Sequence, residues 1–181
     1  MSHKLRCAAG ALLGITLLAG VVGGGVHAAG GRFNTSKSLA LGLYWATSGP
    51  VEKGGYVMFC PPQTSLFSDA RDRGYVASGF CPGNFGPLMK RVLAAKGDQV
   101  SITQQGVEVN GVMLPFSKPL LADGVGRPLP QLAGKTYVLG DQDLLLMTDA
   151  SPTSFDARYF GIIHGTQVIS PIRPVFTWQG E

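Results

Sequence analysis

A lysine on an apolar strand face is the first residue of this chain in a chemically unusual position. Lys90 lies in the β-like run 88–93, and strand alternation puts it on the same face as Leu88, Val92 and Ala94. Two interpretations are open: either the ammonium extends to the edge of the sheet, or the amine is desolvated. At its ordinary pKa only about one lysine in 2,500 is neutral at pH 7. Desolvation lowers the pKa, so only the second interpretation provides a general base.

A general base needs a nucleophile, and hydroxyl groups occur early in the chain. The segment Asn34–Ser38 reads Asn-Thr-Ser-Lys-Ser and follows a long uncharged run. Taken alone, such a segment is an ordinary polar linker or helix cap. It gains meaning only together with Lys90 and a C-terminal segment described below.

The histidines and cysteines do not form a metal-binding pattern. His3 precedes the uncharged run, His27 lies within it, and His164 stands alone, so no two share an i, i+4 spacing. The chain also lacks HxxxH, CxxC and GxGxxG motifs. We therefore expect no metal and no other cofactor, and we interpret His164 as a surface residue rather than as the base of a catalytic triad.

Composition and turn signals predict one mainly β domain over residues 32–181. The chain has 181 residues, 26 of them glycine, and a formal net charge of +4 without a run of basic residues, so nucleic acid is not an expected partner. Asn110-Gly111 predicts a type I′ hairpin turn. A helical turn is expected at Asp69–Arg73, and a long loop at Ser117–Gly134. The expected strands are Tyr56–Phe59, Leu88–Ala95, Val107–Val109, Val112–Leu114, Tyr137–Leu139, Leu144–Met147 and Gln167–Ile169.

The N-terminal segment 1–31 predicts export. Lys4 and Arg6 precede 25 residues, 7–31, without Asp, Glu, Lys or Arg. As a helix this run would extend about 37 Å, and the preceding positive charge places the N-terminus in the cytoplasm. Two interpretations remain open: a signal peptide cleaved after Val26-His27-Ala28, or a retained membrane anchor.

Export changes the interpretation of the cysteines. Cys60 and Cys81 each lie in a Phe-Cys-Pro triplet, and an oxidising compartment favours a disulfide between them. Such a bond would contribute roughly 3 kcal/mol in the chain-entropy model. The alternative is two buried thiols. Cys7 is expected to be unpaired.

Three segments, in this order, resemble the sequence boxes of signal peptidases, and most closely those of the TraF-type peptidases of bacterial conjugative transfer. The first is Asn34–Ser38, followed by Gly42–Trp45; the second is Met89–Asp98; the third is Ser154–Gly161. The resemblance extends over about residues 32–175. Each box alone is weak, but three boxes in order and at this spacing form a specific pattern.

The resemblance implies a signal-peptidase-like β domain with a Ser/Lys dyad. It assigns Ser38 as nucleophile and Lys90 as base. It adds Asp156 as a supporting acidic residue of the catalytic set and Arg158 as its structural partner. The Ser38 backbone N–H and the Ser36 hydroxyl are the expected oxyanion donors, and a simple capping role for Ser36 is the alternative.

The same resemblance implies the substrate and the location. The expected partner is the conjugative pilin, or another signal-peptide-bearing precursor, with small residues at −1 and −3. It would be cleaved, with or without cyclisation, at the periplasmic face of the inner membrane. The alternatives are a non-catalytic periplasmic scaffold of a conjugation or type IV secretion apparatus, and a cell-envelope binding module. Ala40 stands where the family usually has proline, and it is the only sequence feature that favours the scaffold.

Overall fold

The structure, a computed structural model, describes residues 3–178, and the side chains of residues 14–178. The chain divides into two compact units between Arg32 and Phe33. The first unit contains helix α1 (His3–Ala28). The predictions for His3 and for Cys7 concern side chains outside the described set.

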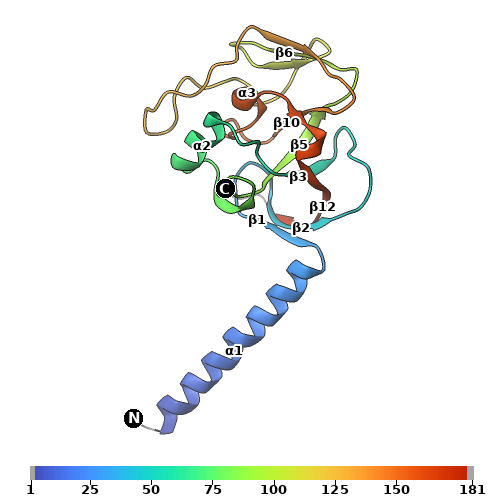
Figure 1. Cartoon of the computed structure of the whole chain (residues 1–181). Coiled ribbons are helices and arrows are strands. Elements are labelled where there is room, and N and C mark those ends of the chain that lie inside the picture. Colours follow the sequence, from blue (N-terminus) through green and yellow to red (C-terminus); the bar gives the residue numbers. More distant parts are fainter. Residues whose placement is uncertain (1–2, 179–181) are drawn as a thin grey trace. The chain divides into compact units, whose positions relative to one another are not determined.

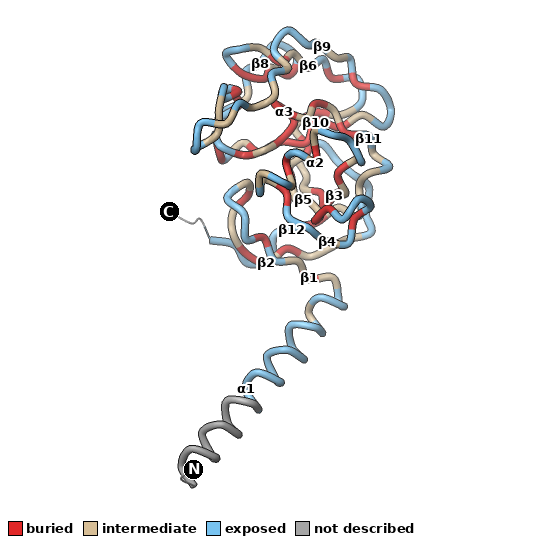
Figure 2. The backbone as a smooth tube through the Cα atoms, turned by 60° about the vertical axis from the view of Figure 1, so that its left-hand side comes forward, coloured by how far each residue is buried: buried red, intermediate tan, exposed pale blue. Residues whose placement is uncertain are grey.

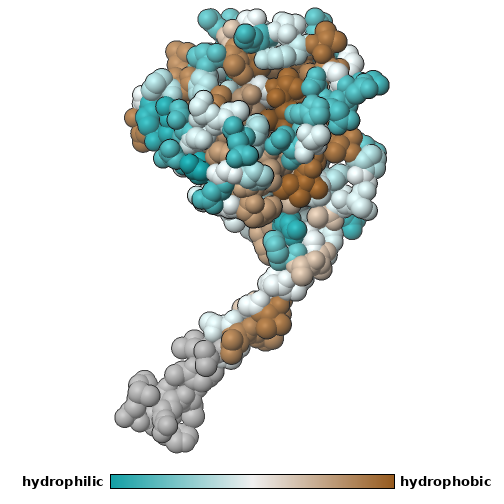
Figure 3. All heavy atoms as spheres, in the orientation of Figure 1, coloured by the Kyte–Doolittle hydropathy of each residue, from teal (hydrophilic) through white to brown (hydrophobic). Residues whose placement is uncertain are grey.

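Helix α1 carries exposed apolar side chains in its described part, visible as a brown surface along the helix in Figure 3. They are Ile15, Leu17, Leu18, Val21 and Val22. Within the residues that the structure describes, no helix reaches the length and hydropathy needed to cross a membrane.

The second unit is mainly β, which confirms the predicted fold class (Figure 1). A seven-stranded sheet has the order β1-β2-β12-β3-β5-β10-β11, and a four-stranded sheet has the order β8-β7-β6-β9. The strands of the larger sheet are β1 (Gly31–Asn34), β2 (Leu41–Ala46), β12 (Val168–Trp178), β3 (Tyr56–Phe59), β5 (Leu88–Ala94), β10 (Asp143–Met147) and β11 (Ile163–His164). Those of the smaller sheet are β8 (Val112–Met113), β7 (Val107–Val109), β6 (Gln99–Ile102) and β9 (Lys135–Val138). The remaining elements are α2 (Ser65–Asp72), β4 (Ser78–Cys81), α3 (Ala157–Phe160) and a 3₁₀ turn at Gly165–Gln167.

Burial is concentrated along the central strands, as Figure 2 shows for β3, β5 and β10. One core cluster joins β3, β5 and β10 to α2, through residues such as Val57, Val92 and Phe67. A second cluster joins β5 and β10 to the smaller sheet and α3. Both clusters include a buried residue of β5, the strand that carries Lys90: Val92 in the first and Ala94 in the second.

Two glycine-dependent features fix local geometry. The β7–β8 hairpin turns through Asn110 (φ 53°) and Gly111 (φ 79°), which confirms the predicted type I′ turn. Gly42 in β2 has φ 144°, and a Cβ there would lie 2.2 Å from the carbonyl oxygen of Phe176 in β12. The pairing of β2 with the long strand β12 therefore requires glycine at this position.

The helical turn expected at Asp69–Arg73 is the end of a longer helix, α2, which begins at Ser65. Its burial of Phe67 and Ala70 is the 3.6-residue spacing of an amphipathic helix. The prediction began too late by one turn. Thr64, a common type of N-cap residue, precedes the helix but makes no side-chain capping bond.

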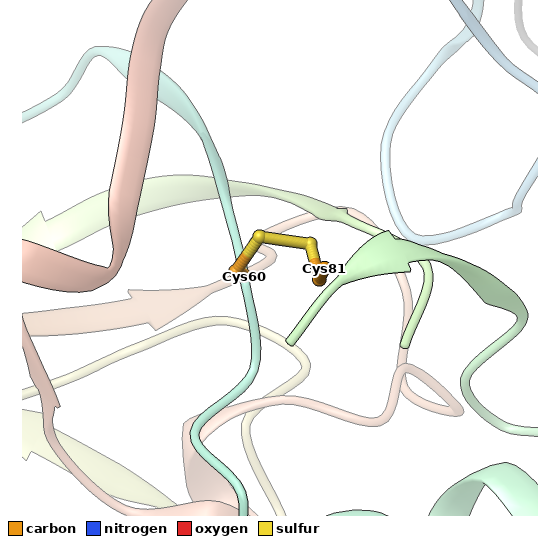
Figure 4. Close-up of a disulfide and its surroundings, with 2 residues drawn as sticks. All are labelled: Cys60 and Cys81. Carbon is orange, nitrogen blue, oxygen red and sulfur yellow. A yellow bond between two sulfur atoms is a disulfide. The ribbon is translucent and has the colours of Figure 1, made fainter. Parts of the chain in front are cut away.

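A disulfide joins Cys60 to Cys81, with the two Cα atoms 5.5 Å apart (Figure 4), which confirms the predicted pairing. Cys60 follows β3, and Cys81 is the last residue of β4. The bond therefore fastens the segment that contains α2 to the central sheet.

Candidate active site

The loop that carries Ser38 is organised by the side chain of Asn34, at the end of β1. Asn34 is only 6% exposed. Its Nδ2 donates to the carbonyl oxygens of Ser36, Leu39 and Ala40, each at 3.0 Å. Its Oδ1 accepts from the Ser36 backbone N–H at 3.2 Å and from the Ser36 hydroxyl at 2.9 Å. One amide group therefore holds the backbone on both sides of Ser38.

The residues that follow Ser38 are also anchored. Leu39 is 5% exposed and packs in a cluster with Tyr44, Met58 and Ile172. The carbonyl oxygen of Ala40 accepts from Asn34 Nδ2 and, at 2.9 Å, from the Tyr44 hydroxyl. These two bonds fix the position where the family usually has proline, so rigidity at Ala40 does not depend on a pyrrolidine ring.

Lys90 is buried, with 2% of its surface exposed. It lies directly opposite Val57 across the β3–β5 pair, and alternation along β5 buries Lys90, Val92 and Ala94 together. The predicted apolar row is confirmed as buried at Val92 and Ala94, whereas Leu88 at the start of the strand is only partly buried. Of the two interpretations of Lys90, the structure supports the desolvated amine.

Burial lowers the pKa of Lys90 from 10.5 to about 8, because the ammonium loses its hydration. The negative charge of Asp156 opposes this shift, and the positive charge of Arg158 adds to it. No carboxylate among the described residues forms an ion pair with Lys90. At a pKa of about 8, about one molecule in ten carries neutral amine at pH 7.

Asp156 and Arg158 form a fully buried ion pair. Arg158 Nε and Nη2 each lie 2.8 Å from an oxygen of the Asp156 carboxylate. The guanidinium also donates to the carbonyl oxygens of Ser151, Pro152 and Phe116. Because Asp156 caps α3 and is paired to Arg158, its contacts here are those of a residue that holds the 151–158 segment in place.

The 151–158 segment also contacts the predicted nucleophile. The Ser154 hydroxyl, in a side chain that is 4% exposed, donates to Ser38 Oγ at 3.3 Å. This leaves the Ser38 proton available to another acceptor. A surface hollow of about 170 Å³ adjoins Ser38 and is lined also by Tyr75, Ser154 and Phe155.

The structure thus links Ser38 to the segment whose charged pair, Asp156 and Arg158, acts electrostatically on Lys90. Sequence reasoning did not assign roles to Asn34 or Ser154, although both lie within the motif segments. Their residue types and positions carried no signal for these contacts, which depend on the tertiary fold.

The third histidine lies apart from these contacts. His164 is exposed in β11, at the edge of the larger sheet, and its Nδ1 lies 2.9 Å from the Thr166 hydroxyl. Among the described residues, no group of three or more His, Cys, Asp or Glu side chains could hold a metal ion.

The chain belongs to the signal peptidase family, peptidase S26, whose sequence profile matches residues 16–178. It is 57% identical over 158 residues to a plasmid transfer protein TraF of Escherichia coli, covering 87% of this chain and 89% of that protein. It is 35% identical over 172 residues to a conjugal transfer protein TraF of Agrobacterium fabrum, covering 94% of this chain and 92% of that protein. Among solved structures, a signal peptidase I of Enterococcus faecalis superposes with a TM-score of 0.38 at 18% identity, covering 69% of this chain and 98% of that one.

Proposed function

We propose that this chain is a serine endopeptidase that uses Ser38 as nucleophile and Lys90 as general base to process exported precursor proteins. The observation that carries this proposal is the burial of Lys90, because burial brings its pKa down to about 8. Membership of the signal peptidase family supports the same reaction class.

In the proposed reaction, the neutral amine of Lys90 removes the proton of Ser38 Oγ as this oxygen attacks the scissile carbonyl carbon. The C–N bond then breaks, and the amine product leaves with the proton taken from Lys90. A second nucleophile, water in simple hydrolysis, resolves the acyl-enzyme. The Ser154 hydroxyl donates to Ser38 Oγ and so orients the attacking oxygen.

The developing oxyanion needs donors, and the Ser38 backbone N–H is the first. The Ser36 hydroxyl is not free for this role at rest, because it donates its hydrogen to Asn34 Oδ1. Ser36 is exposed, so substrate can compete for this hydroxyl, which must rotate away from Asn34 to serve as a second donor. Asp156 supports catalysis through Arg158 and through its charge near Lys90, rather than by transferring a proton.

The names of the relatives point to the substrate. Proteins named for plasmid and conjugal transfer support the conjugative pilin as the precursor, cleaved where small residues stand at −1 and −3, at the periplasmic face of the inner membrane. The same acyl-enzyme can be resolved by the N-terminal amine of the pilin, which would give a circular product. Intact mass spectrometry separates the two products, because the circular form is lighter by one water.

Loss of function at either dyad residue tests the proposal. Ser38→Ala and Lys90→Ala should each abolish cleavage of a pilin precursor by the full-length protein. Lys90→Arg should be equally inactive, because guanidinium keeps its proton at neutral pH. Lys96→Arg is the matched control, since Lys96 is a surface lysine paired with Asp141. Appreciable cleavage by Lys90→Arg would refute the lysine-base mechanism. Failure of the wild-type protein to cleave any precursor would instead favour the non-catalytic scaffold.

A further inference from the structure

A second hollow, of about 200 Å³, adjoins the hollow beside Ser38. The two share Tyr75, Thr153 and Phe155 in their linings. We call the second one the Phe155 chamber, and its main walls are Tyr75, Leu120, Leu129, Phe155 and Tyr159. Phe155 follows Ser154, the residue that contacts the nucleophile, so the chamber begins one residue from the candidate active site.

The walls of the chamber are held by contacts of their own. Phe155 stacks on Tyr159 with ring centroids 5.8 Å apart and planes 3° apart, and Tyr75 lies 5.5 Å from Phe155. The Tyr159 hydroxyl accepts from the backbone N–H of Leu120 at 3.1 Å. A preformed aromatic and aliphatic pocket of this kind is typical of a ligand subsite.

Asp123, the charged residue in the lining of the chamber, is paired with neighbouring polar groups. The Tyr75 hydroxyl donates to Asp123, and Arg127 Nε lies 2.7 Å from the same carboxylate. Because these groups satisfy each other, the interior offers an apolar surface without a free charge to be neutralised. The chemistry that fits this interior is an uncharged apolar side chain.

We propose that the Phe155 chamber is a substrate subsite that binds a large aliphatic side chain of the precursor, distinct from the positions that require small residues. This inference rests on the proposed peptidase function. A peptide bound across Ser38 extends into the neighbouring hollow, and a side chain a few positions from the scissile bond then enters the chamber. Burial of one large aliphatic side chain should raise kcat/KM about tenfold to a hundredfold over alanine.

The test moves a single leucine through a peptide that has alanine at −1 and −3 and small residues elsewhere. With the full-length wild-type protein, one position should show the leucine preference. Leu120→Asp should abolish that preference, so that kcat/KM is about equal for leucine and alanine, because it places a carboxylate at the chamber wall. Leu121→Asp is the matched control: Leu121 is the next residue, is 77% exposed and does not line the chamber, so the preference should persist.

Two further arms keep the outcome decisive. Leu120→Trp should fill the chamber and favour alanine over leucine at the same position. Binding of the uncleaved peptides to Ser38→Ala, measured by fluorescence anisotropy, should show the same preference without catalysis. Cleavage without a leucine preference at any position would overturn the subsite and leave the peptidase intact. A preference unchanged in both Leu120 variants would also overturn it, whereas no cleavage of any peptide would contradict the proposed function itself.

Discussion

Replacing Lys90 by methionine removes the ionisable group and keeps a long apolar side chain at the buried position on β5. The pKa of Lys90 is about 8 in the folded protein and near 10.5, the ordinary value for lysine, in the unfolded chain. Between these values the unfolded chain binds more protons than the folded one, so the free energy of unfolding rises with pH. At pH values above the pKa of Lys90 in the unfolded chain, its burial costs no stability. As the pH falls towards 8, the free energy of unfolding decreases, because the unfolded chain takes up the proton first.

The size of the effect follows from the shift. A difference of about 2.5 pKa units at 1.36 kcal/mol per unit corresponds to about 3 kcal/mol. Near pH 7 the wild-type protein bears this whole free-energy cost of burying a protonatable amine, and Lys90→Met does not. The variant should therefore be more stable at pH 7, by up to about 3 kcal/mol, and this advantage should shrink towards pH 10.

Urea unfolding of the full-length chain at pH 7, 8.5 and 10 measures this difference. The comparison between variant and wild type cancels the titration of all other groups. Lys96→Met is the control, because the Lys96 side chain is 72% exposed and its replacement should change stability equally at all three pH values. If the difference between Lys90→Met and wild type were the same at pH 7 and pH 10, the desolvated-lysine reasoning would be refuted.

Three further predictions concern Asn34, the disulfide and Asp156. Asn34→Ala removes three donated hydrogen bonds, so it should lower the free energy of unfolding by about 3 kcal/mol and reduce kcat. A free energy of unfolding in urea that differs from wild type by less than about 0.5 kcal/mol, on the order of experimental error, would contradict this. Replacing Cys60 and Cys81 by alanine should lower the free energy of unfolding by about 3 kcal/mol. An unfolding midpoint that changes neither on this substitution nor on addition of reductant would count against the disulfide. Asp156→Asn should destabilise the fold by about 3–5 kcal/mol, because it leaves the Arg158 charge buried without its carboxylate. It should also lower the pKa of Lys90 further, so the alkaline rise in activity of the folded fraction should move to lower pH; a rise that stays in place would show that Asp156 does not act on Lys90.

The parts of the fold that sequence predicted are those set by local chemistry. Asn110-Gly111 defined a hairpin, because few dipeptides adopt two successive positive φ angles. The alternation around Lys90 identified the buried face of β5. Val92 and Ala94 continue the apolar face at every second residue, and Lys90 is a polar residue within that face. The paired Phe-Cys-Pro triplets similarly pointed to the disulfide.

The parts that sequence missed depend on long-range contacts. Strand β2 includes Gly42, a weak strand former, and it exists because β12 pairs with it over Leu41–Ala46. Strand β12 contains Pro171 and Pro174, which interrupt the pattern and shortened the prediction to Gln167–Ile169.

At the candidate site, residue type and motif order identified Ser38, Lys90, Asp156 and Arg158 as the residues of interest. Their contacts required the fold. The five hydrogen bonds of Asn34 and the contact between Ser154 and Ser38 join residues whose relation is set by tertiary packing. The Phe155 chamber likewise brings together Tyr75, the loop at 120–129 and the segment at 153–159.

The dependence of kcat/KM on pH tests the identity of the base most directly. It should be measured for full-length wild type and for His164→Ala on one peptide with small residues at −1 and −3. If Lys90 is the base, activity should rise with a midpoint near pH 8, reach a plateau in alkaline buffer, and follow the same curve in both proteins. A rise at about pH 6–7 that disappears in His164→Ala would contradict the account, because it would make an imidazole the base.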